Sequence, residues 1–390
     1  MADKQGAPVM RVEAAELHFL EIPFRLSITH GARAARTFSD SLVLRLSGGG
    51  RTGYGEGVVR EYVSGSLGSG EDFQREAVRI TTSLLAPLRE RELSWQDAVA
   101  CLNSLECDSR SLPLLCTVET ALLGLAVSEA GVDAYRFLGM TPLRTTLVYG
   151  GVLPILPFAH ARTYLDICAG MRLENVKVKV GGDKAYTEAI LALCREKLGN
   201  ACDLRVDANG AWAAEDVDAQ MDICGRHGVR IIEQPFPVSS GQNTAASARM
   251  RERGFALMAD EGILDAADVR SIAASGLCRM LNLRLSKNGG LHRVLSLARE
   301  TEASGLTYQL GCMVGETGIL SALGRMAAAL LPRAVYLEGG YDDVLLAGNV
   351  TTRSFGFGPG GRAEIVRGSG MGFEVDEQKL AKFSRARVVL

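Results

Sequence analysis

The sequence lacks the features that would tie it to a polyanion, a membrane or an oxidising compartment. Its formal net charge at pH 7 is only −2 over 390 residues, which argues against nucleic acid or anionic lipid as the main partner. No apolar run approaches the roughly 20 residues of a membrane span. Residues 1–5 have no apolar signal-peptide core. We therefore expect a cytoplasmic protein that binds neither nucleic acid nor membrane.

Paired cysteines and nucleotide-binding turns are also missing. The nine cysteines are an odd number and none forms a Cys-x-x-Cys pair, so we expect small, free side chains in a reducing compartment. No Gly-x-Gly-x-x-Gly turn follows an early strand, which disfavours a dinucleotide-binding, doubly wound sheet.

The first third of the chain groups its predicted strands before its predicted helices. We expect a strand over residues 12–22, a polar loop over 23–35, hairpin strands over 40–46 and 52–58, and helices over 71–89, 95–105 and 116–130. Strands followed by helices are typical of an α+β domain. We place this domain at residues 1–132 and expect the tail, residues 363–390, to pack back on it.

From about residue 145, short apolar runs alternate with amphipathic helical segments. The runs occupy residues 147–150, 176–180, 203–206, 231–232, 256–259, 280–285, 307–310 and 335–337. Eight βα-type repeats of about 30 residues give the roughly 250 residues of a (β/α)₈-type TIM barrel. We therefore predict an α/β fold with the barrel at residues 133–362.

In the second predicted barrel strand, residues 175–180, valines alternate with Lys177 and Lys179. Successive side chains of a strand point to opposite faces, so one face is apolar and the other carries two ammonium groups. An exposed strand would simply solvate them. Strands of a parallel sheet are covered on both faces, and a lysine is rarely buried without a compensating partner. We therefore expect acidic groups nearby.

Acidic residues follow the next three predicted strands. These are Asp207, Glu233 and Asp260. The carboxyl ends of barrel strands meet at one face, where active sites lie. Any one of these residues taken alone is more often a helix N-cap, but three in register favour a hard cation such as Mg²⁺, with Mn²⁺ as a substitute. Zn²⁺ is disfavoured because no His or Cys joins the set.

Lys179 and Lys287 come from the second and sixth predicted strands, on opposite sides of the barrel. Two such lysines suit proton transfer at a carbon atom. General acid–base catalysis supplies roughly 10²–10⁴-fold acceleration, whereas enzymes typically provide at least about 10⁶. Electrostatic stabilisation by a bound cation is the expected source of the remainder.

Taken together, these motifs resemble the enolase superfamily, specifically its muconate-lactonizing branch. The matching segments are Val176-Lys-Val-Lys179, Val206-Asp-Ala-Asn209, Ile232-Glu-Gln-Pro235, Ala259-Asp-Glu261, Lys287-Asn-Gly-Gly290 and Gly311-Cys-Met313. The resemblance implies a modified (β/α)₇β barrel under an α+β capping domain. It also implies a small carboxylate substrate, whose α-proton is abstracted to give an enolate.

Residue by residue, the resemblance makes Asp207, Glu233 and Asp260 the metal ligands. It makes Lys179 and Lys287 the acid/base pair and Lys177 the residue that stabilises the enolate. The candidate substrate-binding residues are Arg25, Arg33, Tyr62, Asn209, Cys312, Glu316 and Glu338. Dipeptide epimerases carry Asp-x-Asp at the eighth strand end, where this chain has Tyr336-Leu337-Glu338. The mandelate-racemase branch would have a histidine after the seventh strand, which is absent here.

The residues leave more than one reaction open. Our leading hypothesis is racemisation or epimerisation of an amino acid derivative, either a dipeptide or an N-acylamino acid, by two bases. Cycloisomerisation of the muconate type, or β-elimination of the o-succinylbenzoate synthase type, needs only one lysine as base. A non-catalytic barrel is disfavoured because buried charges are costly to keep without use. We also expect a homo-oligomer.

Overall fold

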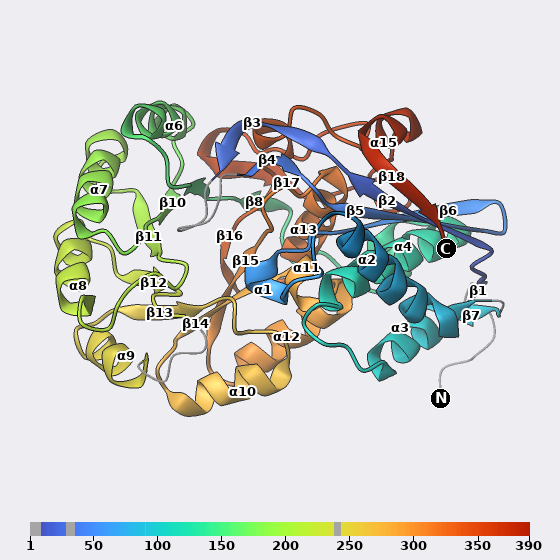
Figure 1. The fold of residues 1–390 in the computed structure, drawn as a ribbon, viewed down its shortest axis with the longest axis horizontal. Helices are drawn as coiled ribbons and strands as arrows, with labels where there is room; N and C mark the ends of the chain where they lie inside the picture. The colour runs from blue at the N-terminus through green and yellow to red at the C-terminus, as the bar shows by residue number, and fades with distance from the viewer. Residues whose placement is uncertain (1–8, 29–35, 90, 238–242) are drawn as a thin grey trace.

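The computed structural model describes residues 9–28, 36–89, 91–237 and 243–390. One side of the molecule is a barrel and the other a capping layer of antiparallel strands and helices (Figure 1). The early strand β2 (Ala14–Leu20) and the late strand β18 (Ser384–Val389) pair with each other in the capping layer. The barrel predicted from the alternating runs is confirmed.

The main capping sheet has the strand order β18-β2-β5-β6. Its strands are β2 (Ala14–Leu20), β5 (Leu42–Gly48), β6 (Arg51–Gly57) and β18 (Ser384–Val389). The predicted hairpin is confirmed, because β5 and β6 pair antiparallel through the turn at Gly49 and Gly50. Both glycines have positive φ, the conformation that two-residue hairpin turns require.

The polar loop expected over residues 23–35 is wrong for residues 23–28, while residues 29–35 lie outside the described residues. Ile22–Ile28 forms strand β3, which pairs antiparallel with β4 (Arg36–Ser39). Most of its side chains are exposed, so the apolar pattern that marks a strand in sequence is weak there. The shorter capping elements are β1 (Val9–Met10), α1 (Glu61–Ser64), α2 (Gly70–Leu85), η1 (Ala86–Leu88), β7 (Leu93–Ser94), α3 (Trp95–Ser104) and α5 (Ala134–Phe137).

Helix α4 (Leu112–Ala130) is the central helix of the capping layer. It begins four residues before the expected start, and its 19 residues with a mean hydropathy of 1.4 are long and apolar enough to cross a membrane. That corrects our expectation that no apolar run approaches such a length. The helix is 89% buried, and it packs on β6 so closely that a Cβ on Gly55 would stand 1.9 Å from the carbonyl oxygen of Thr117. Its apolar character thus belongs to the core.

In the described residues, eight parallel strands form the barrel in sequential order. They are β9 (Gly151–Leu153), β10 (Asn175–Lys179), β11 (Asp203–Asp207), β12 (Ile231–Glu233), β13 (Ala256–Ala259), β14 (Met280–Arg284), β15 (Thr307–Gly311) and β16 (Ala334–Leu337). The connecting helices are α6 (Phe158–Gly170), α7 (Lys184–Leu198), α8 (Val217–Arg226), α9 (Asn243–Glu252), α10 (Ala266–Ser275), α11 (Leu285–Asn288), α12 (Leu291–Ala303) and α13 (Gly318–Leu330). The Gly150 N–H donates to the Leu337 carbonyl at 2.9 Å and links the two edges.

The first barrel strand was predicted in the wrong place. The run at residues 147–150 belongs to β8 (Thr146–Val148), which pairs antiparallel with β17 (Arg362–Glu364) outside the barrel. The chain enters the barrel only after Gly150, where a Cβ would stand 2.0 Å from Oδ1 of Asn175. The apolar sequence runs through this glycine without a break, so the change of sheet was hidden. The last segments, α14 (Asp342–Leu345), η2 (Pro359–Gly361) and α15 (Glu377–Phe383), lead to β18.

Candidate active site

The two lysines of β10 point into the barrel. Both are buried, with exposed fractions of 2% for Lys177 and 6% for Lys179, while Val176 and Val178 pack on the opposite face. The Lys177 ammonium donates to Oε2 of Glu233 at 3.0 Å and to Oε2 of Glu338 at 2.8 Å. These contacts supply the acidic partners that the alternating pattern of the strand demanded.

Lys179 contacts the end of the neighbouring strand. Its Nζ lies 3.0 Å from Oδ2 of Asp207 and 2.9 Å from Oδ1 of Asn209. The Asn209 N–H donates to Oδ1 of Asp207 at 3.0 Å. Asn209 has a φ of +46° and Gln234, after β12, a φ of +40°. Positive φ at residues other than glycine is strained and gathers at functional sites.

The three predicted metal-ligand carboxylates lie fully buried at the ends of adjacent strands. Asp207 stands opposite Glu233 in the register of β11 and β12, and Asp260 follows β13 directly. Asn282 donates to Oε1 of Glu233 at 2.8 Å, and Gln309 donates to Oε2 at 3.2 Å. The site is therefore fixed to the barrel scaffold and not to loops.

Asp260 pairs with two cations. Lys287, in the short helix α11, donates to Oδ1 of Asp260 at 2.9 Å and to the carbonyls of Asp260 and Asn282, both at 2.6 Å. Arg284, the last residue of β14, donates to the other carboxylate oxygen. Lys287 thus lies across the barrel from Lys179, as its place in the strand order predicts, with three oxygen acceptors around its ammonium.

Burial and neighbouring charges move the pKa values in opposite directions. Burial raises the pKa of Glu233 to about 7 although Lys177 opposes it. Burial would also raise the pKa of Asp207, but the ammonium groups of Lys179 and Lys177 outweigh it and lower that pKa. Burial lowers the pKa of Lys287. The Asp260 carboxylate raises this pKa but offsets only part of the effect of burial. The site therefore holds groups whose ionisation is tuned by their surroundings.

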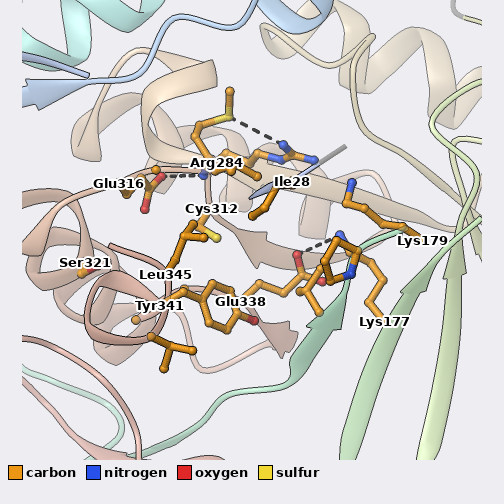
Figure 2. A pocket seen from close by; sticks show the side chains of 18 of the residues that line it. Ile28, Lys177, Lys179, Arg284, Cys312, Glu316, Ser321, Glu338, Tyr341 and Leu345 are labelled. Carbon is orange, nitrogen blue, oxygen red and sulfur yellow. Dashed lines mark hydrogen bonds and ion pairs between the residues drawn. The ribbon is translucent and has the colours of Figure 1, made fainter. Parts of the chain in front are cut away.

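A cavity of about 110 Å³ opens beside these groups. Figure 2 shows Lys177, Lys179, Arg284 and Glu338 around it. Much of the remaining wall is apolar, formed by Leu26, Ile28, Val152, Pro154, Tyr164, Met313, Val314, Tyr341, Val344 and Leu345. Leu26 and Ile28 come from β3 of the capping layer, so both halves of the fold shape this cavity. Lys287 is not among its lining residues.

The predicted substrate-binding residues divide into two groups. Cys312, Glu316 and Glu338 line the cavity. Burial raises the pKa of Glu316 to about 8, and its Oε1 accepts the Met313 N–H at 2.6 Å. Cys312 is a free thiol whose pKa burial raises well above the ordinary value.

The other candidates lie away from the cavity wall or outside the described residues. Arg25 donates to the Leu346 carbonyl at 2.9 Å and ties β3 to the segment after α14. Tyr62 is half-buried on α1 and acts electrostatically on Arg284. Arg33 lies outside the described residues. Asn209 contacts Lys179 and is not a cavity-lining residue.

Glu338 is bonded to protein cations on both of its oxygens. One oxygen accepts from Lys177, and Nη2 of Arg205 donates to the other at 2.9 Å. Arg205 is fully buried on β11 and stacks on the ring of Tyr336 with its guanidinium carbon 3.7 Å from the ring centroid. Burial opposes ionisation, but Lys177 and Arg205 prevail and lower the pKa of Glu338. Its charge is already compensated within the protein.

Comparison with known proteins identifies the family. Residues 161–379, more than half of the chain, match the family described as enolase C-terminal domain-like. The chain belongs to the enolase superfamily. Among its relatives is the hydrophobic dipeptide epimerase of Roseobacter litoralis, 27% identical over 315 residues, which are 80% of this chain and 86% of that protein. Muconate cycloisomerase 1 of Pseudomonas putida is 29% identical over 283 residues, covering 69% and 71%. These relatives place the chain in the muconate-lactonizing branch.

Solved structures agree with this assignment at the level of the fold. The N-succinyl Arg/Lys racemase of Bacillus cereus superposes with a TM-score of 0.84 at 20% identity, covering 98% of this chain and all of that one. The dipeptide epimerase of Enterococcus faecalis, complexed with Mg and the dipeptide L-Leu-L-Tyr, superposes with a TM-score of 0.79 at 19% identity, covering 94% and 100%. The resemblance inferred from the sequence motifs is confirmed.

The donor set of this enolase-superfamily site suits a hard cation. Asp207, Glu233 and Asp260 offer only oxygen, and Oε2 of Glu261 is buried without a hydrogen-bond partner. Among the residues that the structure describes, however, no three acidic, imidazole or thiol groups converge at ligand distance. Each carboxylate is bonded to its own lysine, arginine or amide donors instead. The three carboxylates therefore suit a hard metal cation. In this structure, lysine and arginine side chains neutralise them.

Sequence reasoning missed the two buried arginines of the site. Arg284 and Arg205 lie one pleat from Asn282 and Asp207 respectively, on the inward faces of β14 and β11. The signal in the sequence was the same two-residue alternation that places the lysines of β10 on one face of their strand. Residues 280–285 look like one apolar run, and this conceals the polar positions Asn282 and Arg284 within it.

Proposed function

We propose that this protein is a Mg²⁺-dependent racemase or epimerase that removes the proton α to a carboxylate of an amino acid derivative. The observation that carries the proposal is the set of buried lysines on opposite sides of one barrel, paired with carboxylates on adjacent strands. A dipeptide or an N-acylamino acid is the expected substrate, and Mn²⁺ is an expected substitute for Mg²⁺. The epimerase and racemase relatives support this chemistry.

The side chains divide the reaction between them. Asp207, Glu233 and Asp260 would hold the cation, which when bound supplies positive charge against the negative charge that develops on the substrate. Lys179 faces the cavity and takes the α-proton from one side. Lys287 delivers a proton from the opposite side, and Lys177 keeps a fixed positive charge between Glu233 and Glu338. The apolar cavity wall excludes water from the carbanionic substrate.

Cycloisomerisation is the second candidate, and one observation favours it. Three oxygen atoms surround Nζ of Lys287, and this residue does not line the cavity. A reaction with one base needs only Lys179 at the substrate and leaves Lys287 as a buried cation. Muconate cycloisomerase 1 is among the relatives.

Exchange of the α-proton in D₂O separates the candidates. We expect the wild type with Mg²⁺ to incorporate deuterium into both enantiomers of some N-acylamino acid or dipeptide, and EDTA to abolish the incorporation, as followed by ¹H NMR. Lys179→Ala and Lys287→Ala should each lose exchange of one enantiomer, because a planar intermediate held in place is reached from each face by one lysine. If no such substrate exchanges its α-proton, and if Lys287→Ala still turns over muconate, the proposed function changes from racemase to cycloisomerase.

We also propose that the chain works in the cytoplasm as a homo-oligomer. All nine cysteines are free, which supports a reducing compartment. Light scattering coupled to gel filtration measures the molar mass directly, and a mass near 41.7 kDa would contradict the homo-oligomer.

A further inference from the structure

Arg284 occupies the space between two carboxylates to which the proposed function assigns a cation. Its Nη2 donates to Oδ2 of Asp260 and lies 3.6 Å from Oε1 of Glu233. The residue is 6% exposed. A guanidinium therefore stands where two of the three predicted ligands face each other.

This guanidinium is only partly bonded. Its Nε is buried without a hydrogen-bond partner among the described residues, where Nη1 donates to the sulfur of Met313 at 3.6 Å and to no other atom. Arginine has five N–H donors, and a strong arginine–carboxylate pair uses two of them in parallel. Lys287, by contrast, has three oxygen acceptors around one nitrogen. Arg284 is held chiefly by the negative charge of the cluster, since few hydrogen bonds fix its geometry.

The cavity offers the Arg284 side chain a second position. Arg284 lines the cavity together with Cys312 and Met313, whereas Lys287 does not line it; Figure 2 shows Arg284 and Cys312 at this cavity. Rotation of the side chain would carry the guanidinium into the cavity while β14 keeps its place in the sheet. Lys287 would have to break its hydrogen bonds to two backbone carbonyls before it moved.

When all are ionised, the basic and acidic side chains of this cluster in the described site are equal in number. The basic groups are Lys177, Lys179, Arg205, Arg284 and Lys287, and the acidic groups are Asp207, Glu233, Asp260, Glu261 and Glu338. A divalent cation added to this set meets like charge at the oxygen atoms it needs. This repulsion is relieved most easily when a protein cation moves away. The one that moves should share those oxygens and have the fewest hydrogen bonds.

We propose that Arg284 is an internal placeholder for the divalent cation. In the metal-free protein it neutralises Asp260 and Glu233, and it withdraws toward the cavity when the cation binds. This inference rests on the metal site of the proposed function. Because the guanidinium and the cation compete for the same oxygens, Arg284 weakens cation binding and stabilises the metal-free fold.

Direct measurement of Mn²⁺ binding to the full-length, metal-free protein tests the placeholder. Arg284→Gln keeps a donor toward Asp260 but removes the charge, and Arg284→Met removes both. We expect both variants to bind Mn²⁺ more tightly than the wild type, on the order of tenfold in Kd by electron paramagnetic resonance. Their metal-free melting temperatures should fall, and saturating Mn²⁺ should restore them.

The matched control is Arg325→Met on α13. Arg325 is another buried arginine, but its guanidinium donates to the backbone carbonyls of Phe355 and Gly356, away from the carboxylates. This variant should lose stability with or without Mn²⁺ and leave the Kd unchanged.

The outcomes separate the inference from the proposed function. Unchanged or weaker Mn²⁺ binding in Arg284→Gln and Arg284→Met, with binding intact in the wild type, overturns the placeholder alone. A wild type that binds neither Mn²⁺ nor Mg²⁺ refutes the proposed function and the placeholder with it. An Arg284 variant that folds only when Mn²⁺ is present supports the placeholder. Variants that fold under neither condition refute it, because Arg284 would then be needed in the bound state as well.

Discussion

Removing the Glu338 carboxylate should chiefly lower the free energy of unfolding of the barrel. Its effect on substrate recognition should be the smaller of the two. Glu338 joins Lys177 and Arg205 through hydrogen bonds of 2.8 and 2.9 Å. Without it, Lys177 keeps Glu233 as a partner, but Arg205 retains only Oδ1 of Asn175 at 3.3 Å and the Tyr336 ring. Breaking a buried ion pair by removing one partner costs about 3–5 kcal/mol. We expect a loss of this size in Glu338→Ala, and of about 2–4 kcal/mol in Glu338→Gln, whose amide oxygen still accepts one hydrogen bond.

Urea denaturation at pH 7, followed by circular dichroism, measures this loss in free energy of unfolding. Glu316→Gln is the matched control, because Glu316 lines the same cavity but bonds only to a backbone N–H and has a pKa of about 8. Most of that carboxyl is uncharged at pH 7, so the control should stay within about 1 kcal/mol of the wild type. A Glu338→Ala variant as stable as the control would refute the structural pairing. Glu338 would then be free to bind a cationic group of the substrate, as the sequence suggested.

Three further outcomes are expected. Asp207→Asn should weaken Mn²⁺ binding at least about tenfold, as measured by titration calorimetry, without loss of the cooperative melting transition, because the ligand sits on the scaffold and does not hold it together. Burial raises the pKa of Glu119 to about 7 from 4.5, so its contribution to stability is full below pH 4.5 and is lost as the pH rises through 7. Glu119→Gln, whose amide oxygen still accepts the His292 N–H, should therefore gain up to about 3 kcal/mol on the wild type between pH 5 and pH 8 in urea denaturation; an unchanged difference would contradict this. Gly150→Ala should lower the melting temperature by several degrees, because its Cβ would overlap Oδ1 of Asn175, and an unshifted transition would show that Asn175 can turn away.

The position of a side chain can be predicted from sequence where it follows from the residue's own strand. Lys177 and Lys179 alternate with valines, so their common inward face could be predicted from period two alone. Asp207, Glu233 and Asp260 each follow an apolar run, and barrel topology brings the ends of such runs together. The two lysines are confirmed as buried, and Asp207 and Glu233 are bonded to them, whereas Asp260 is bonded to Lys287.

The errors arose where position depends on a partner elsewhere in the chain. Residues 147–150 look like any other apolar run, and only pairing with β17 assigns them to a separate sheet. The exposed strand β3 owes its conformation to β4. Which cation neutralises which carboxylate depends on the register of strands far apart in sequence, as in the pairing of Arg205 with Glu338. No local pattern carries that information.

The pairing of β18 with β2 constrains how this protein is made. Nδ1 of His18 on β2 hydrogen-bonds the Ser384 hydroxyl, across a separation of 366 residues. A ribosome releases β2 long before β18, because the whole barrel lies between these two strands in the chain. In the interval β2 presents an unpaired edge, the feature that invites aggregation with other nascent chains. The capping sheet can therefore be completed only after the barrel has been synthesised, and a chain truncated before Ser384 would keep that edge open however well its barrel had folded.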